Sequence, residues 1–291
     1  MNDPAADVGR PRLASLEALL APFEADAAKR NAARRSGRPW GPVTGLGKLD
    51  DELGGALENG LHVVHGSPGV GKTAFALQIG ATCGCPCLYV TAEMSPVELL
   101  RRVAARTTGT YLGRLKSGEM APADALAVVR RGAEAAPLLA IADATTAHAP
   151  ADWIEEMGRV VRGEHGHLLI VVDSLHSWAE GGADGATEYE SLNDGIRGLR
   201  GVASRLGCPV LAIAERNRAS MRTGGLSAGA GTRGIEYKGE SVWDLSADEN
   251  ALPTVGGETP VTLTLEKNRN GSQRGKVALR FSGRLQAFSE A

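Results

Sequence analysis

The chain of 291 residues contains few aromatic side chains, which make up 4% of it. Its core must therefore be built mainly from Val, Ile, Leu and Ala. Hydrophobic residues reach 43%, and the length allows one large α/β domain or two small ones. An excess of positive charge is also lacking, since the formal net charge is -2. Any contact with nucleic acid must therefore come from local basic patches rather than from the whole surface.

Long apolar segments are absent as well. No run of apolar residues is long enough to span a bilayer. Residues 1–9 are polar and acidic, and they do not have the charged and then apolar layout of a signal peptide. We therefore expect a cytoplasmic protein without a membrane partner.

Cysteine is scarce, with four residues at Cys83, Cys85, Cys87 and Cys208. Three of them form a Cys-x-Cys-x-Cys cluster, whereas zinc sites usually use Cys-x2-Cys pairs. Cys85 and Cys208 each stand in a Gly-Cys-Pro sequence just before an apolar segment. We expect buried, reduced cysteines that pack as small apolar residues, with a metal site as the alternative.

The N-terminal part is expected to form a helix over residues 15–35, with Leu16, Leu19, Leu20 and Phe23 on one side. Its C-terminal end is basic, which suits the helix dipole. It is either a solvated helix end or an arm that docks on a neighbouring subunit. A Gly- and Pro-containing connector over residues 37–42 follows. We place the domain boundary there, with a linker or docking helix over 1–41 and the main domain over 42–291.

Strands and helices are expected to alternate through most of the main domain. Continuous apolar strands between amphipathic helices predict a parallel twisted sheet with helices on both faces. The strands are predicted at 61–65, 87–92, 138–142, 168–173 and 209–214, and the helices at 72–81, 96–107, 123–135, 151–162 and 189–206. Alternating residues over 261–266 and 276–281, joined by a Gly-containing turn, predict a C-terminal antiparallel hairpin. Gly-rich stretches at 180–187 and 223–232 are expected to be loops.

A complete phosphate-binding loop lies between the first strand and the first helix of this domain. Its glycines allow backbone N–H groups to point inward at phosphate oxygens, and the helix that follows adds a positive dipole end. We expect ATP to bind here, with Lys72 at the β- and γ-phosphates and Thr73 on Mg²⁺. The nucleotide-binding residues are Gly66, Ser67, Pro68, Gly69, Val70, Gly71, Lys72, Thr73 and Ala74.

Two carboxylates follow other strands of the predicted sheet. Asp173 ends the most apolar strand, where an acidic residue reaches the Mg²⁺ shell in phosphate-loop enzymes. A helix cap is the alternative. Glu93 ends the strand after the phosphate-loop helix and could deprotonate the attacking water. On position alone, a cap or first-turn residue of the next helix is equally good for Glu93.

Basic residues mark two further places. Lys267 and Arg269 lie two apart at the end of a strand, so both point to one face if the strand continues. A turn with solvated charges is the alternative. Glu215 begins a Glu-Arg-Asn-Arg segment at the end of the 209–214 strand, beside a Gly-rich loop with more arginines. Clustered arginines beside loops could contact a nucleic-acid backbone.

Several ordered segments together resemble the RecA-type motor domain of DnaB-like replicative helicases, over about residues 42–288. They are Thr44-Gly-Leu-Gly-Lys-Leu-Asp50, Glu93-Met-Ser-Pro96, Asp173-Ser-Leu-His176, Arg233-Gly-Ile-Glu236 and Lys267-Asn-Arg-Asn-Gly271. The resemblance implies a RecA-like phosphate-loop NTPase fold that uses ATP and Mg²⁺.

The resemblance also implies roles for single residues. Glu93 becomes the catalytic base, and Lys267 and Arg269 reach into the ATP site of the next subunit of a hexameric ring. The Gly-rich loops would hold single-stranded DNA, and the residues implied there are Arg218, Arg222, Arg233 and Gly234. The implied activity is unwinding of duplex DNA in the replication of a plasmid, phage or other mobile element.

The chain departs from the family pattern in three ways, one of which is that the segment around Arg233 carries less charge than the family's. Only about forty residues precede the resemblance, as in stand-alone plasmid RepA-type helicases, and Glu215 stands where the family has a γ-phosphate-sensing Gln. A carboxylate facing phosphate needs a compensating cation such as Arg216, Arg218 or Mg²⁺. The alternatives are a recombination or KaiC-like regulatory ATPase without helicase activity, and an assembly factor that binds ATP without turnover.

Overall fold

The computed structural model describes residues 13–182, 187–215, 238–247, 257–271 and 275–291. The chain divides into two compact units, residues 1–41 and 42–291. In the first unit a short 3-10 turn, η1 (Glu17–Leu19), leads into helix α1 (Leu20–Ser36). Helix α1 ends at Gly37, whose φ of 65° is left-handed and favours glycine. No residue of α1 is buried, so its apolar side chains are accessible to solvent.

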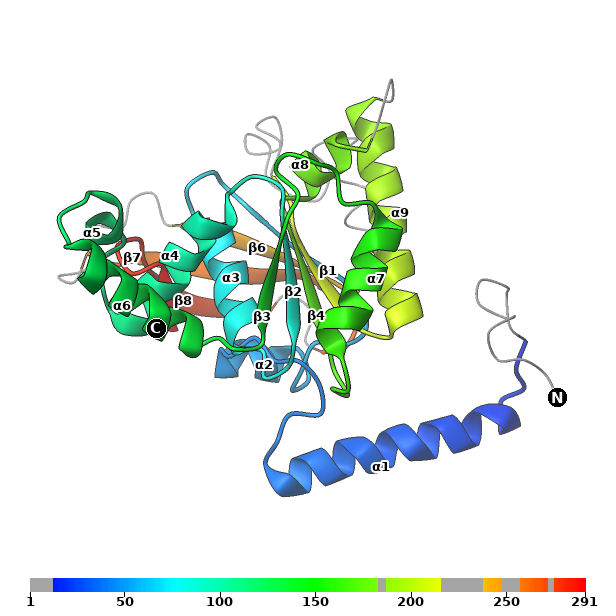
Figure 1. The fold of residues 1–291 in the computed structure, drawn as a ribbon. Coiled ribbons are helices and arrows are strands. Elements are labelled where there is room, and N and C mark those ends of the chain that lie inside the picture. The colour runs from blue at the N-terminus through cyan, green and yellow to red at the C-terminus, as the bar shows by residue number, and fades with distance from the viewer. Residues whose placement is uncertain (1–12, 183–186, 216–237, 248–256, 272–274) are drawn as a thin grey trace. The chain divides into compact units, whose positions relative to one another are not determined.

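The second unit is built on one mixed sheet, whose strands β2, β3 and β4 lie between α3 and α7 in Figure 1. In the described residues the strand order is β3-β2-β4-β5-β1-β6-β7-β8-β9. The first six of these pair in parallel, and β7, β8 and β9 continue the sheet antiparallel. The bounds are β1 (Gly60–Gly66), β2 (Cys87–Thr91), β3 (Leu139–Asp143), β4 (Leu169–Asp173), β5 (Pro209–Ile213), β6 (Ser241–Ala247), β7 (Thr259–Asn268), β8 (Lys276–Ser282) and β9 (Ala287–Glu290).

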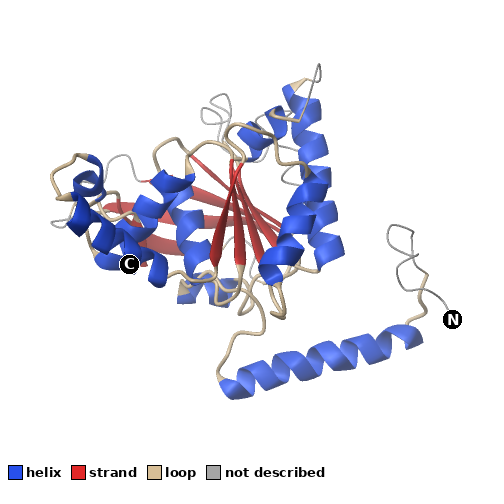
Figure 2. Ribbon diagram, viewed as in Figure 1, coloured by secondary structure: helices blue, strands red, loops and turns tan. Residues whose placement is uncertain are grey.

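Helices cover both faces of this sheet, as Figure 2 shows. One face carries α2 (Gly47–Glu52), α3 (Lys72–Thr82) and α4 (Pro96–Thr108), with α5 (Leu112–Lys116) and α6 (Pro122–Glu134) further out. The other face carries α7 (Ala151–Arg162), α8 (Leu175–Glu180) and α9 (Glu188–Leu206). The predicted parallel sheet with helices on both faces and a C-terminal antiparallel hairpin is thus confirmed. None of the described helices is long and apolar enough to cross a membrane.

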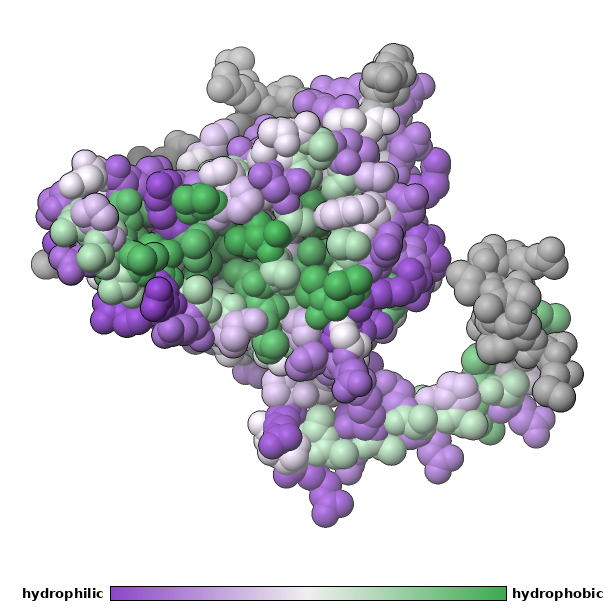
Figure 3. Space-filling model, viewed as in Figure 1, coloured by the Kyte–Doolittle hydropathy of each residue, from purple (hydrophilic) through white to green (hydrophobic). Residues whose placement is uncertain are grey.

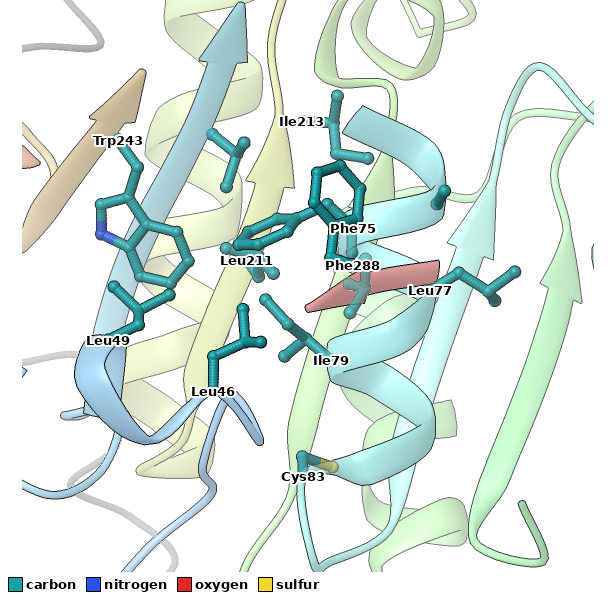
Figure 4. Packing of buried hydrophobic residues seen from close by; sticks show 14 of the residues in the cluster. Leu46, Leu49, Phe75, Leu77, Ile79, Cys83, Leu211, Ile213, Trp243 and Phe288 are labelled. Carbon is teal, nitrogen blue, oxygen red and sulfur yellow. The ribbon is translucent and has the colours of Figure 1, made fainter. Parts of the chain in front are cut away.

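The alternation of side chains along the strands creates two apolar layers. Val64 of β1 belongs to the layer under α3, whereas Val63 belongs to the layer under α9. In the α3 layer, Phe75 meets Trp243 and Phe288 edge-on, at ring distances of 6.3 and 5.2 Å (Figure 4). Each large side chain buried in this way contributes about 2 kcal/mol. This packing anchors the phosphate-loop helix between the parallel strands and β9.

Some elements were not expected from the sequence. Strand β6 (Ser241–Ala247) is the most important, because it extends the parallel part of the sheet beyond β1. Its polar Ser241 and Asp244 obscure the apolar pattern, although both are buried. The short helices α2, α5 and α8 and the last strand β9 were also missed. The loop expected at 180–187 begins one residue later, because α8 includes Glu180, and its residues 183–186 lie outside the described residues.

The prediction of buried cysteines is confirmed. Cys83, Cys85, Cys87 and Cys208 are all buried and none forms a disulfide. The sulfur atoms of Cys83 and Cys85 are 3.7 Å apart, and the Cys83 thiol also lies 3.2 Å from the backbone oxygen of Cys85. These thiols therefore pack at the end of α3 and the start of β2, away from the carboxyl ends of the strands.

Candidate functional site

The phosphate-binding loop turns directly from β1 into α3. Gly69 and Gly71 have φ values of 82° and 97°, which favour glycine. A Cβ atom on Gly71 would come within 2.9 Å of the Phe281 ring, so the loop also needs glycine for close packing. The first turn of α3 begins at Lys72 and presents its N–H groups at the loop. This geometry suits phosphate.

The side chain of Lys72 lies inside the loop. Its Nζ donates to the backbone oxygens of Gly66 and Ser67, at 2.9 and 3.3 Å. Burial lowers the pKa of Lys72, while the charges of Glu215, Glu93 and Asp173 oppose that shift. The ammonium thus contacts the loop backbone, and the carboxylates of Glu215, Glu93 and Asp173 act on it through their charge.

Asp173 ends β4 and is 2% exposed. Its Oδ2 accepts a hydrogen bond from the Tyr89 hydroxyl at 2.6 Å, and it is also hydrogen-bonded to Thr73. Burial raises the pKa of Asp173 to about 6, although the bonds from Tyr89 and Thr73 lower it. A carboxylate beside the Thr73 hydroxyl is the donor set that Mg²⁺ prefers. The alternative role as a helix cap does not hold, because Ser174 caps α8.

Glu93 follows β2 and is exposed. Its Oε1 accepts hydrogen bonds from the hydroxyls of Ser174 and Ser177, the latter at 2.9 Å. Helix α4 is capped by Ser95, whose Oγ accepts from the N–H of Glu98. Glu93 is therefore not the cap of this helix, and its carboxylate faces the end of β4 instead.

Glu215 follows β5 and lies at the same edge of the sheet. Its backbone N–H donates to Nδ1 of His176, at 3.2 Å. Burial lowers the pKa of His176, while the charges of Glu215 and other carboxylates raise it. His176 therefore accepts at Nδ1 as a neutral imidazole and fixes the backbone of Glu215 beside the phosphate loop.

These side chains surround one pocket of about 500 Å³. The sequence-predicted residues in its wall come from the loop, β2, β4 and β5, and they are Pro68, Gly69, Gly71, Lys72, Thr73, Ala74, Glu93, Asp173 and Glu215. The wall also contains residues that sequence reasoning missed, which are Met94, Arg102, Ser174, Ile213, Phe281, Gly283 and Gln286. Arg102 donates to Gln286, which links α4 to the turn before β9. The pocket fits a nucleotide with Mg²⁺, because glycine-lined backbone, a lysine and a buried carboxylate beside a hydroxyl converge in it.

Lys267 and Arg269 do not line this pocket. Lys267 pairs with Val242, near the start of β6, whereas Leu245 of β6 pairs with Gly66 at the loop. The guanidinium of Arg269 lies 3.3 Å from Glu240 and is exposed. Burial and the charge of Arg269 lower the pKa of Lys267. The two basic residues therefore stand together but away from the phosphate loop of their own chain.

The residues expected to contact nucleic acid lie in one segment. Arg218, Arg222, Arg233 and Gly234 fall in 216–237, outside the described residues. The same holds for Arg216, one of the cations expected to compensate Glu215, and for the Gly-rich stretch at 223–232.

A second polar cluster lies behind the loop, on β1, β6 and β7. Nε2 of His65 is 2.9 Å from Glu266, and Nδ1 is 3.3 Å from Asp244. Burial opposes a charge on His65, but the two carboxylates outweigh it and raise the pKa of His65 to about 9. Three such side chains could in principle hold a metal ion. Because each ring nitrogen faces its own carboxylate, the geometry suits a buried imidazolium.

Comparison with known proteins places this arrangement in a family. The DnaB-like helicase C-terminal domain matches residues 41–290. The replicative DNA helicase DnaB of Treponema pallidum is 27% identical over 260 residues, which are 85% of this chain and 56% of that protein. DnaB of a Nostoc species is 29% identical over 180 residues, 60% of this chain and 20% of that protein. The chain thus spans about half or less of these relatives.

The fold comparison agrees with the sequence comparison. A DnaB-like replicative helicase, whose solved structure describes its interactions with primase, superimposes with a TM-score of 0.78 at 18% identity. That match covers 96% of this chain and 68% of the helicase chain. The predicted RecA-like fold is confirmed by this likeness. The chain therefore belongs to the DnaB-like helicase C-terminal domain family.

Proposed function

We propose that this chain is an ATP-hydrolysing motor of the DnaB type, which assembles into a ring and moves on single-stranded DNA. The observation that carries the proposal is the pocket itself. Lys72 and Thr73 at the start of α3, Asp173 at the end of β4 and Glu93 after β2 come from three separate segments of the chain and meet around one glycine-lined cavity. A loop that only bound nucleotide would not require an acidic residue poised opposite the phosphates.

The residues have separate tasks in hydrolysis. Lys72 and the N–H groups of α3 hold the β- and γ-phosphates, and Thr73 and Asp173 hold Mg²⁺, which neutralises phosphate charge when bound. Glu93 accepts a proton from the water that attacks the γ-phosphate. Glu215 lies beside Lys72, so it lowers the positive potential at the γ-phosphate compared with an amide at that position.

A neighbouring chain supplies the remaining charge in this proposal. Lys267 and Arg269 stand together at the end of β7 and outside the pocket of their own chain. They can stabilise the transition state only if they act on the ATP of another subunit, as arginine fingers do in trans. A ring in which each chain offers one pocket and one basic pair satisfies this requirement, and we propose a hexamer.

Exposed apolar surface supports an assembly. Figure 3 shows apolar residues gathered on the face where α4, α6 and β3 lie in Figure 1. Exposed large side chains on these elements include Val97 of α4 and Leu126 of α6, at 57% and 58% exposure, and Leu138 just before β3, at 40%. Grouped apolar side chains on a surface favour contacts with another protein surface.

The deciding experiment measures ATP turnover with and without single-stranded DNA, together with unwinding of a forked duplex. The motor proposal expects DNA-stimulated turnover and strand separation. Stimulation without unwinding would instead favour a recombination or regulatory ATPase. Absence of turnover under both conditions would leave a nucleotide-binding assembly factor. Glu93→Gln is expected to bind ATP and to stop hydrolysis, and normal turnover in that variant would remove Glu93 as the base.

A further inference from the structure

Two serine hydroxyls converge on one oxygen of Glu93. Ser174 directly follows β4, and Ser177 lies in the first turn of α8. Both hydroxyls donate to Oε1 of Glu93, Ser177 at 2.9 Å. A serine hydroxyl has a single proton to donate, so each proton is used on the carboxylate.

The pair is itself held in place by local structure. The N–H of Ser177 donates to Oγ of Ser174 at 3.4 Å, which is the cap of α8, and the two hydroxyl oxygens are 3.2 Å apart. Ser174 is 2% exposed. The backbone N–H of Ala92 donates to the oxygen of Asp173 at 2.7 Å, so the ends of β2 and β4 are fixed to each other just before Glu93 and Ser174.

This arrangement leaves the two oxygens of Glu93 in different situations. Oε1 accepts two hydrogen bonds, whereas Oε2 accepts none from the residues that the structure describes. An exposed glutamate has three rotatable side-chain bonds and would otherwise sample many positions. A general base must lie within hydrogen-bond reach of the water it deprotonates.

We propose that Ser174 and Ser177 are positioning residues that hold Oε1 of Glu93 and direct Oε2 at the water attacking the γ-phosphate. The proposal rests on the proposed function, since it needs Glu93 to act as the base. The two serines do not touch the nucleotide loop through any described hydrogen bond. Their loss should therefore reduce the chemical step and spare the binding of nucleotide.

The test compares Ser177→Ala and Ser174→Ala with the unchanged chain in steady-state ATP hydrolysis. Each variant is expected to lower kcat by about tenfold, which is less than the roughly 10²- to 10⁴-fold contribution of a general base, because Glu93 is misplaced rather than removed. KM for ATP and the affinity for a fluorescent ADP analogue should change by less than about twofold. Ser177→Ala is the cleaner variant, because Ser174→Ala also removes the cap of α8. Ser174→Thr keeps a hydroxyl and a cap, and it should retain most of the rate.

Thr187→Ala is the matched control. It removes the hydroxyl that caps the adjacent helix α9 and has no described contact with Glu93, so its kcat should stay unchanged. In a Glu93→Gln background, Ser177→Ala should cause no further loss, because its effect acts through that carboxylate.

Two results would overturn the positioning role. One is an unchanged kcat in both alanine variants when Glu93→Gln is inactive, which would leave the proposed function intact. The other is a rise in KM with kcat preserved, which would mean that the serines serve nucleotide binding. If Glu93→Gln itself turned over normally, the assignment of the base would fail first, and the serines would have no base to position.

Discussion

The backbone N–H of Glu215 donates to Nδ1 of His176, at 3.2 Å, and so joins the segment after β5 to helix α8. Because an imidazole nitrogen can accept a hydrogen bond only when it carries no proton, His176 is neutral in this contact. It therefore holds the backbone of Glu215 without cancelling the charge of its carboxylate. The charge of Glu215 acts on Lys72 more strongly than the charge of any other carboxylate.

The Glu215 carboxylate should weaken ATP binding. In Glu215→Gln the repulsion between this carboxylate and the phosphates is removed, while the backbone contact with His176 remains. We expect KM for ATP to fall by about tenfold, which corresponds to about 1.4 kcal/mol. Titration of ATP in a steady-state assay at constant free Mg²⁺ measures this change.

Glu134→Gln serves as the control for charge, because Glu134 is an exposed carboxylate at the end of α6 that does not line the pocket. Its KM should match that of the unchanged chain. A KM for Glu215→Gln that is equal to or above the unchanged value would show that Glu215 does not oppose the phosphates.

The sequence was sufficient for the part of the site that follows from strand ends. The phosphate loop, Glu93 and Asp173 each come just after an apolar segment, and parallel strands bring such ends to one edge. Lys267 and Arg269 were singled out because they belong to a short motif, and their role stays a prediction. Their position outside the pocket, however, depends on the pairing of β7 with β6, which the sequence did not predict.

The remaining contacts could not be predicted from the sequence, and the reason is physical. Ser174 and Glu93 are 81 residues apart, and His176 and Glu215 are 39 apart, so only the packed sheet brings them together. Strand β6 was missed because a buried Asp244 interrupts its apolar pattern. That aspartate forms an ion pair with His65, which lies on another strand.

The charged state of His65 should make stability depend on pH. Its pKa is about 9 in the folded chain, against about 6.5 in an unfolded chain. The folded state therefore holds the proton more tightly, and this contribution is fully present below pH 6.5. It is lost as the pH rises through about 9, and it amounts to about 3 kcal/mol. Chemical denaturation at pH 6.5, 8 and 9.5 measures the free energy of unfolding across this window.

His65→Gln should remove most of that pH dependence and lower stability already at pH 6.5, since two buried carboxylates lose their cation. His62→Gln is the matched control. His62 is also buried on β1, but burial lowers its pKa and its ring nitrogens face Ser241 and a backbone oxygen. The His62→Gln variant should still lose stability between pH 6.5 and 9.5, as the unchanged chain does. The same slope in His65→Gln as in the unchanged chain would contradict a buried imidazolium.

Asn268 is expected to support the basic pair at the end of β7. It is 4% exposed, donates to the backbone oxygen of Glu52 at 2.8 Å, and accepts from the N–H of Asn270 at 3.1 Å. Asn268→Ala leaves the backbone oxygen of Glu52 without this donor, which should cost about 1 kcal/mol of unfolding free energy. Turnover should fall as well, because Arg269 loses its anchored neighbour.

Thermal unfolding and ATP turnover of Asn268→Ala, measured together, separate these effects. Asn193→Ala provides the comparison, since the half-buried Asn193 amide donates to a backbone oxygen of its own helix α9 and accepts from Lys238 at 3.3 Å, and its loss should change neither property strongly. If Asn268→Ala unfolds like the unchanged chain, the contact with Glu52 has no stabilising role.

Mixing two inactive variants tests whether the pocket is shared between chains. Lys72→Ala destroys the pocket of its own chain but keeps Arg269, and Arg269→Ala keeps an intact pocket but loses the basic side chain. Each should be inactive alone. In an equal mixture, an intact pocket faces an intact arginine at roughly a quarter of randomly formed interfaces, so about a quarter of the rate should return. ATP turnover after mixing and incubation measures the recovered rate. Arg280→Ala is the control, because it removes an exposed arginine from β8 and should be active by itself. If Arg269 acted on the ATP of its own chain, no mixed interface would be complete and the mixture would stay inactive.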